Sequence, residues 1–391
     1  MTERIYYTDS YLRDFPASVV ETSPDGLAVY LDRTAFYPAS GGQPFDTGVI
    51  GRAAVVEVID EGERIAHRVA SPVAVGPTAC AIDWKRRFDH MQQHTGQHLL
   101  SAVFAEKLGL RTVSFHLGTE ISTIDVEGGA VEPAALREAE RRANEIVCEN
   151  RPVTVAFEDA RDAQDLRKPS EREGALRIVC IDGLDRSACG GTHVRATGEI
   201  GVILLRKLEK IRQTVRVEFL CGARASARAR ADYEALAQCA HLFSAPLDEA
   251  PALVASQLES ARTAEKARRK LAIEVAGYQG RELYAATAPD QDGLRRATRR
   301  AAAGNLEELR ALAQSFAAQP RAAFLAVLDE PPSVLLATSE DSGIDAGKAL
   351  KAVLTEAGGR GGGSPRIAQG SVPDRGLLGL VMEKLGAPTT R

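Results

Sequence analysis

The chain has 391 residues, of which 44% are hydrophobic and 26% charged, and its formal net charge is −4. This is the composition of an ordinary globular protein long enough for two or three domains. It excludes a strongly basic protein, although a local basic patch can still bind nucleic acid. The N-terminus lacks a signal-peptide pattern, and no apolar run approaches the roughly 20 residues that span a bilayer.

The six cysteines are scattered without the spacing of a disulfide framework. Reduced thiols fit this arrangement better than disulfides. We therefore expect a cytoplasmic protein without membrane association.

Residues 1–84 read as β structure. Short runs at 19–22, 26–31 and 53–58 are bounded by proline, glycine and aspartate. Short, regularly spaced strands with turn signals predict a small N-terminal β-barrel.

Residues 85–223 mix helices with strands. The apolar pattern predicts one helix over 86–108, with Gly109 as its stop, and a second near 133–150. Strands are expected around 153–157, 177–181, 202–206 and 215–220. The sequence thus predicts an α+β protein whose barrel is followed by an α/β sandwich core.

Residues 224–285 turn helical. Leu236, Ala240, Phe243 and Leu247 recur at steps of four and three, and two prolines split the region. This pattern predicts a linker that is a helical hairpin or a broken coiled coil. Charged residues fill the other face, which is either solvated or a surface that follows a tRNA backbone.

Residues 286–391 predict a compact α/β domain. Runs at 323–328 and 334–337 read as strands on either side of a Pro-Pro turn. The glycine-rich run at 358–364 either cradles phosphate through backbone N–H groups or is a flexible loop. It is not a P-loop, because no Gly-Lys-Ser/Thr follows it.

Two short motifs carry metal-type spacing. His94 and His98 stand four residues apart on one face of the predicted helix, and Cys189 and His193 flank a Gly-Gly-Thr turn. Three imidazoles and one thiolate are the ligands of tetrahedral zinc, so we expect one Zn²⁺ per chain. His90 lies in the same helical row, so three histidines line up although only two are expected to bind, and the sequence leaves the role of His90 open. The alternative is partly buried histidines with a core thiol.

These motifs lie within a wider resemblance. The chain resembles the long form of the alanyl-tRNA editing proteins (AlaX family), and also the editing and C-terminal domains of alanyl-tRNA synthetase. The residues that carry the resemblance are the segments 34–38, 41–48, 94–100, 114–118, 122–125, 189–194 and 197–201, with 358–364 and 368–370 near the end. It touches nearly the whole chain and divides it into a barrel (1–84), a zinc-containing editing core (85–223), a helical linker (224–285) and a DHH-associated-type C-terminal domain (286–391).

The resemblance implies an aminoacyl-tRNA deacylase that acts in trans on mischarged tRNA(Ala). We expect hydrolysis of Ser-tRNA(Ala), with Gly-tRNA(Ala) as a further candidate, and sparing of Ala-tRNA(Ala). A selective second site makes sense, because a pocket for alanine rejects serine or glycine by only roughly 10–200-fold. The chain is not expected to charge tRNA or use ATP. By resemblance its C-terminal domain recognises tRNA or pairs subunits as a homodimer.

Four further residues are candidates for contact with the substrate. By resemblance Thr34 faces the serine hydroxyl; otherwise it is an ordinary strand residue. Gly42 and Gln43 belong to a Gly-Gly-Gln segment that either faces the tRNA end or forms a turn. His116 either lines the pocket or is a structural strand histidine.

Arginines are the candidates for contact with tRNA phosphates. Arg212 and Arg216 lie in the densest basic stretch of the core, and strand alternation predicts that they share a face. Arg360 lies in the glycine-rich run. Ordinary surface charge is the alternative for all three.

Three rival functions remain at this stage. A zinc-containing protein could bind tRNA without hydrolysis, since a closed tetrahedral site is normally structural. The target could be another mischarged tRNA such as Ser-tRNA(Thr). A DHH-type phosphodiesterase is disfavoured, because the sequence has no Asp-His-His triplet.

Overall fold

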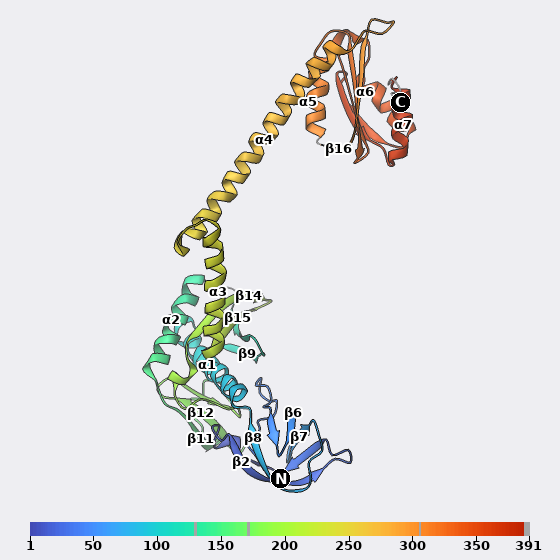
Figure 1. Cartoon of the computed structure of the whole chain (residues 1–391). Helices are drawn as coiled ribbons and strands as arrows, with labels where there is room; N and C mark the ends of the chain where they lie inside the picture. Colours follow the sequence, from blue (N-terminus) through green and yellow to red (C-terminus); the bar gives the residue numbers. More distant parts are fainter. Residues whose placement is uncertain (129–130, 170–172, 305, 387–391) are drawn as a thin grey trace. The chain divides into compact units, whose positions relative to one another are not determined.

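The computed structural model describes residues 1–128, 131–169, 173–304 and 306–386 (Figure 1). Contacts between residues divide the chain into two compact units, Met1–Cys239 and Ala240–Arg391. Helix α3 (Gly222–Leu242) crosses the boundary between them. The finer division into four domains stays a prediction.

Six strands at the start of the first unit, blue in Figure 1, close a barrel in the order β2-β3-β7-β6-β5-β8. Alternation along β2 buries Phe15, Ala17 and Val19 inside it. The predicted small barrel is thus confirmed. Its strands are β2 (Asp14–Thr22), β3 (Ala28–Leu31), β5 (Gly48–Ile50), β6 (Ala53–Asp60), β7 (Ile65–Val69) and β8 (Gly76–Ile82). Strands β1 (Glu3–Arg4) and β4 (Arg33–Thr34) form a separate parallel pair.

The rest of the first unit packs two helices with two antiparallel sheets around one core. Helices α1 (Trp84–Leu108) and α2 (Pro133–Glu149) supply Leu99, Leu100, Val103 and Ile146 to it. One sheet has the order β14-β15-β10-β9 and the other β11-β12-β13. This arrangement confirms the α+β class. The strands are β9 (Thr112–Leu117), β10 (Ser122–Glu127), β11 (Val153–Asp159), β12 (Ala175–Ile181), β13 (Asp185–Ala188), β14 (Ile203–Ile211) and β15 (Thr214–Cys221).

The second unit is built on a five-stranded sheet of order β16-β17-β18-β20-β19, whose strands β17 and β18 are buried on both faces. Alternation along β17 directs Phe324 and Leu328 to one core and Leu325 and Val327 to another. Helices α4 and α5 cover the first face, and α6 and α7 contribute to the second core. The elements are α4 (Ala250–Ala286), β16 (Arg295–Ala303), α5 (Leu306–Ala317), β17 (Ala322–Glu330), β18 (Ser333–Thr338), α6 (Ala346–Glu356), β19 (Arg360–Gly363), β20 (Ile367–Ser371) and α7 (Leu378–Lys384).

The glycine-rich run is not a flexible loop, because its residues 360–363 form β19, which pairs with β20 at the edge of the sheet. Phosphate binding by this run stays a prediction. A Cβ on Gly361 or Gly370 would lie 2.5 or 2.3 Å from Cδ1 of Leu354 on α6. The glycines therefore allow α6 to pack closely on the sheet.

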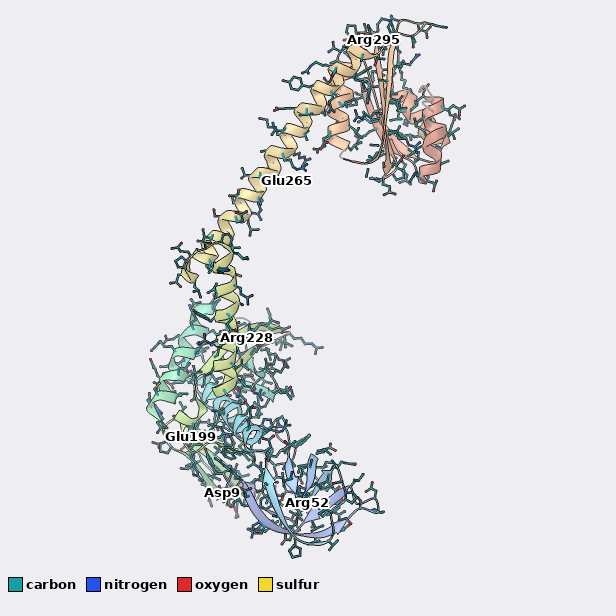
Figure 2. The ribbon with its side chains drawn as sticks, viewed as in Figure 1. Asp9, Arg52, Glu199, Arg228, Glu265 and Arg295 are labelled. Carbon is teal, nitrogen blue, oxygen red and sulfur yellow. The ribbon has the colours of Figure 1, made fainter. Side chains whose placement is uncertain are left out.

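The predicted helical region is helical, with its break at the prolines. Helix α3 ends at Leu242, and α4 begins at Ala250 with Pro251 in its first turn. The missing N–H of proline costs no hydrogen bond there, because first-turn N–H groups have no partner within the helix. Exposed charges on α4, where Figure 2 labels Glu265, pair along the helix. Arg268 lies 2.7 Å from Glu265, which supports the solvated-face interpretation. Pairing of the two helices as a hairpin or coiled coil stays a prediction.

The part of the chain that the structure describes also contains five short 3-10 helices: Ile5–Tyr7, Thr197–Ile200, Leu247–Glu249, Glu340–Ser342 and Arg375–Leu377. No helix among the described residues is both long and apolar enough to cross a membrane.

Candidate metal centre

Helix α1 carries the first pair of metal-type residues in a buried position. The Asp83 carboxylate caps its N-terminus by accepting from the N–H of Arg86, and Gly109 ends it in the left-handed conformation. His94 and His98 are only 1% and 3% exposed. Gly96 lies between them, and glycine is needed there because Cys221 packs against the helix. A Cβ on residue 96 would lie 2.3 Å from Sγ of Cys221.

The second pair lies on the loop that follows β13. The N–H of Cys189 donates to the carbonyl of Arg177 at 3.0 Å, which extends the sheet pairing to the first ligand. A Cβ on Gly191 would lie 2.2 Å from Cε1 of His94, so only glycine lets the loop come this close to α1.

The two motifs meet as the sequence predicted. One ligand atom from each of His94, His98, Cys189 and His193 lies within 4.8 Å of the other three. Nε2 of His94 and Nε2 of His193 are each 3.4 Å from Sγ of Cys189. Ordinary zinc bond lengths in a tetrahedron separate nitrogen from sulfur by roughly 3.5 Å. The separations of Cys189 from His94 and His193 therefore match those of a tetrahedral metal site.

Each histidine has its second nitrogen held by a neighbouring side chain. Nδ1 of His94 lies 2.8 Å from Oε1 of Gln43, and Nδ1 of His98 lies 2.9 Å from Asp185. Nδ1 of His193 lies 3.1 Å from Oγ1 of Thr95. All three rings thus direct Nε2 toward Cys189, as metal-binding histidines do when an outer residue fixes their orientation.

Thr95 and Asp185 are the part of the centre that sequence reasoning missed. Thr95 adjoins His94 in the sequence, and Asp185 precedes Cys189 by one short strand. Asp185 is itself held by Nε of Arg167 at 2.7 Å. The signal that the sequence offered for Asp185 was a carboxylate shortly before a ligand motif. Only the pairing of β12 with β13 brings this carboxylate to His98.

The protonation of the metal-free centre follows from its burial and its neighbours. Burial alone would raise the pKa of the Cys189 thiol, but His94 and His193 outweigh it and hold that pKa well below its usual range. Burial and His94 lower the pKa of His193 to about 3. The centre therefore favours a thiolate, the form that binds a metal.

Of the predicted substrate-facing residues, Gln43 and Gly42 lie at this centre. Gln43 also donates from Nε2 to Oγ1 of Thr192 at 2.8 Å, so its amide faces the metal loop. Gly42 has φ +82°, and a Cβ there would lie 2.8 Å from the ring of Phe115. That ring packs 5.4 Å from His94, centroid to centroid.

Thr34 is fully buried, and its hydroxyl already has partners. Nδ1 of His67 is 3.1 Å from the carbonyl of Val29, so Nδ1 carries the proton and Nε2 is an acceptor. The Thr34 hydroxyl, 2.8 Å from that Nε2, therefore donates to it. The N–H of Phe36 donates to the same oxygen at 3.1 Å.

Among the described residues, none of the four ligands is hydrogen-bonded to His116, Arg212 or Arg216. His116 is exposed, and strand alternation along β9 directs it away from the side of Phe115. The prediction that Arg212 shares a strand face with Arg216 is wrong. Arg212 lies in the turn between β14 and β15 with φ +55°, because the hairpin reverses there.

Arg216 and Arg360 differ in their surroundings. Arg216 lies on β15 opposite Asp125, and its Nε is 2.7 Å from that carboxylate, which neutralises its charge. Arg360 begins β19 and is exposed. Contact between any of these arginines and tRNA stays a prediction.

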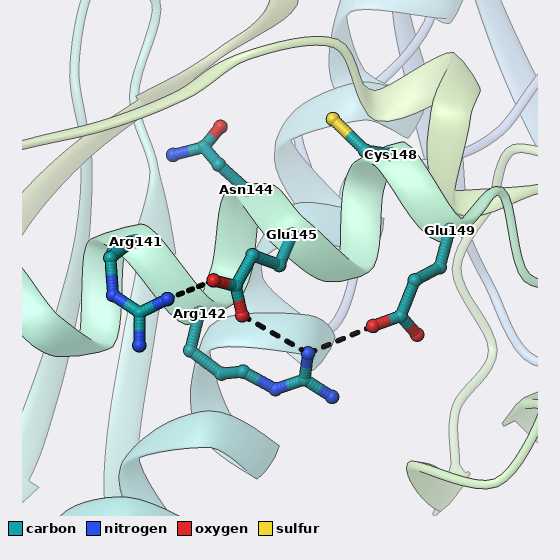
Figure 3. A pocket seen from close by; sticks show the side chains of 6 residues that line it. All are labelled: Arg141, Arg142, Asn144, Glu145, Cys148 and Glu149. Atoms are coloured by element: carbon teal, nitrogen blue, oxygen red, sulfur yellow. Dashed lines mark hydrogen bonds and ion pairs between the residues drawn. The ribbon is translucent and has the colours of Figure 1, made fainter.

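A surface hollow on α2 offers no rival site. Its six lining residues are Arg141, Arg142, Asn144, Glu145, Cys148 and Glu149 (Figure 3). Arg141 pairs with Glu145, and Arg142 lies 3.3 Å from Glu145 and 2.8 Å from Glu149. The charges of the hollow therefore satisfy one another.

Fold and centre together define a class: a metal-site protein in which a small β-barrel precedes an α+β core. Comparison with known families agrees. Residues 176–218, which include Cys189 and His193, match the family described as "Threonyl and Alanyl tRNA synthetase second additional domain".

Whole-chain comparisons make the assignment specific. Alanyl-tRNA editing protein AlaX-L of Pyrococcus horikoshii is 32% identical over 98% of both chains. AlaX-M of Methanosarcina acetivorans is 38% identical, covering 54% of this chain and 94% of that protein. Alanine–tRNA ligase of Pyrococcus abyssi is 29% identical over 95% of this chain but only 42% of its own length. The chain belongs to the alanyl-tRNA editing protein family.

Proposed function

We propose that this protein is a trans-editing hydrolase that removes serine, and also glycine, from mischarged tRNA(Ala) and spares Ala-tRNA(Ala). Membership of the editing family makes it an aminoacyl-tRNA deacylase; the identity of the substrate is what we propose. The observation that carries the proposal is the convergence of four metal-type ligands, of which the three histidines are buried, beside the Gly42–Gln43 segment.

We assign His94, His98, Cys189 and His193 to one Zn²⁺. Zinc suits three imidazoles and a thiolate, whereas Mg²⁺ and Ca²⁺ take oxygen ligands. When bound, the ion supplies a Lewis acid that can polarise an ester carbonyl or a water. Four protein ligands leave no open position, so that role requires one ligand to be labile. With all four ligands bound, the ion would hold the loop after β13 against α1.

The side chains around the centre orient the ligands. Gln43 accepts from Nδ1–H of His94 and from the N–H of Thr192 at 3.1 Å, which ties the Gly-Gly-Gln segment to both motifs. Asp185 accepts from Nδ1–H of His98. We infer that the ester lies beside this segment, whose Gly42 packs closely on the Phe115 ring next to His94.

We propose Thr34 as the residue that selects serine. Its hydrogen is donated to His67, so toward a substrate hydroxyl the Thr34 oxygen acts as an acceptor. Alanine would leave that acceptor position unfilled, which costs about 1–3 kcal/mol relative to serine. Thr34→Ser should keep the preference for serine, and Thr34→Val should lose it.

The decisive experiment is deacylation of Ser-, Gly- and Ala-tRNA(Ala) by the zinc-loaded protein, with Cys189→Ala beside it. Loss of serine with alanine retained, and an inactive variant, is the expected result. Absence of hydrolysis with zinc confirmed in place would instead support a tRNA-binding protein with a structural metal. No membrane partner is proposed, and the cytoplasm is the expected compartment.

A second target deserves a direct assay. The matched family description names threonyl as well as alanyl tRNA synthetases. Faster hydrolysis of Ser-tRNA(Thr) than of Ser-tRNA(Ala) would move the proposal to that tRNA.

A further inference from the structure

Helix α1 carries a third buried histidine that the metal centre does not use. His90 is 2% exposed, and its Nδ1 has no hydrogen-bond partner within the part of the chain that the structure describes. The four ligands already complete a tetrahedral set without it. Buried polar atoms are nearly always paired, so an unpaired imidazole nitrogen beside this centre suggests a ligand.

The position of His90 on the helix shows what it faces. At about 100° per residue, His90 lies about 60° around α1 from Arg87 and about 40° from His94. Arg87 donates from Nη2 to the carbonyl of Ala35 at 2.5 Å, and His94 bonds Gln43. His90 therefore lies on the face of α1 that packs against segment 35–46.

Two arginines that act electrostatically on His90, Arg86 and Arg224, bind backbone carbonyls of neighbouring segments. Nε of Arg86 donates to the carbonyl of Phe45 at 3.0 Å, and Nη1 of Arg224 donates to the carbonyl of Gly118 at 2.7 Å. The backbones of these two carbonyls meet where the N–H of Leu117 donates to the carbonyl of Gly42 at 3.2 Å. His90 thus lies where the Gly-Gly-Gln segment joins the end of β9.

The charge at this position is positive. The groups that act on His90 are Arg86, Arg224, Arg87 and His94, and burial together with them lowers its pKa to about 3. Arg224 pairs with Asp89, and Arg87 pairs with Asp46. Arg86 has no ion-pair partner among the described residues, and it is only partly buried beside the ring of Phe45.

We propose that Arg86 and His90, one turn apart on α1, bind the phosphate of the terminal nucleotide of the tRNA substrate. Arg86 supplies a charged N–H, and the neutral imidazole supplies a second donor. One ribose separates the esterified oxygen from that phosphate, and one helical turn of about 5.4 Å separates His90 from His94. The subsite would thus place the ester at the metal centre. This inference rests on the proposed function.

The test uses the full-length, zinc-loaded protein and its Arg86→Gln, His90→Leu and His90→Gln variants. Steady-state hydrolysis of Ser-tRNA(Ala) is measured over a range of salt concentrations. Lys85→Gln is the matched control, because Lys85 is the adjacent cation and is exposed. Cobalt titration, followed by visible absorption, reports the metal centre independently of catalysis.

Arg86→Gln should raise KM about tenfold with little change in kcat. It should also reduce the slope of log KM against log salt by about 0.7, the value of one single-strand phosphate contact. His90→Leu should lower kcat/KM about tenfold at an unchanged salt slope, and His90→Gln should recover most of it. Cobalt affinity and spectrum should match the wild type in all variants.

Unchanged KM in both Arg86→Gln and His90→Leu would overturn the subsite. So would an altered cobalt spectrum in His90→Leu, since His90 would then belong to the metal centre. If the wild-type protein fails to hydrolyse the ester, the proposed function fails by itself. Binding of uncharged tRNA by the same variants then decides the inference: a salt-dependent loss in Arg86→Gln supports it, and equal binding overturns it.

Discussion

Gln43 accepts a hydrogen bond from Nδ1 of His94 at 2.8 Å, although 51 positions separate the two residues in the chain. The same oxygen accepts from the N–H of Thr192 on the metal loop. The glutamine of the Gly-Gly-Gln segment therefore turns toward the metal centre and orients a ligand of it. Because of this contact, the Gly-Gly-Gln segment beside the barrel belongs to the same site as α1.

Replacing Gln43 should weaken metal binding without removing a ligand. Gln43→Ala leaves Nδ1 of His94 without its acceptor, and loss of such an outer partner typically lowers metal affinity 10–100-fold. Competition with a chromophoric chelator would measure the affinity. Equal affinity in Gln43→Ala and the wild type would show that Gln43 does not orient His94.

Gly191→Ala should disrupt the centre while Gly190→Ala preserves it. The added methyl at 191 would lie 2.2 Å from the His94 ring, whereas at 190 its nearest neighbour is Tyr7 at an ordinary 3.7 Å. We expect Gly191→Ala to bind zinc at least about tenfold more weakly. Metal content after dialysis against a chelator would compare the two variants, and equal retention would contradict the close approach.

Arg87→Leu should strongly destabilise the first unit. Arg87 and Asp46 are both fully buried, and they join α1 to the segment that follows β4. Removing one partner of a buried ion pair costs about 3–5 kcal/mol, because the other charge stays buried. Urea unfolding would measure the loss. Arg268→Gln, which breaks an exposed pair on α4, should have little effect.

Stability should fall between pH 6.5 and pH 4 because of His67. Burial lowers the pKa of this histidine from 6.5 to about 4. The unfolded chain binds the proton over that interval and the folded chain does not, so acid favours unfolding by up to roughly 3 kcal/mol. His67→Gln should flatten this dependence in chemical denaturation across the interval. An identical slope would show that His67 is not the responsible group.

Removal of the second unit should leave some zinc-dependent hydrolysis but weaken tRNA binding. A cut near residue 224 would delete Arg224, whose guanidinium holds Asp89 and Gly118, so the truncated chain should end after α3 at Leu242. Hydrolysis, tRNA affinity and oligomeric state would be compared with the full chain. Complete inactivity of a folded, zinc-loaded truncation would contradict the modular view, and an unchanged oligomeric state would contradict the placement of the homodimer contact in the C-terminal region.

Features set by local spacing could be predicted from the sequence. The apolar period and Gly109 defined α1 to within two residues at its start, and short strands with turn residues predicted the barrel. Steps of four placed His94 above His98, and the two glycines beside Cys189 indicated a turn. Both motifs suit the same metal, which is why their meeting could be expected before the fold was known.

Features set by contacts across the chain could not be predicted. The glycine-rich run pairs as β19 because α6 packs on it, and the hairpin before Thr214 moves Arg212 off the strand face. Asp185, Thr95 and Gln43 become partners of the three ligand histidines only through β12–β13 pairing and the packing of α1.

The sequence by itself determined the ligand types, their spacing and the α+β class, because these depend on residue chemistry and local periodicity. Tertiary structure alone decided that His90 is surplus to the metal, that Asp125 neutralises Arg216 and that Thr34 donates to His67. Each of these outcomes depends on which distant backbone brings a partner within about 3 Å, and hydrogen bonds and ion pairs act only at that range.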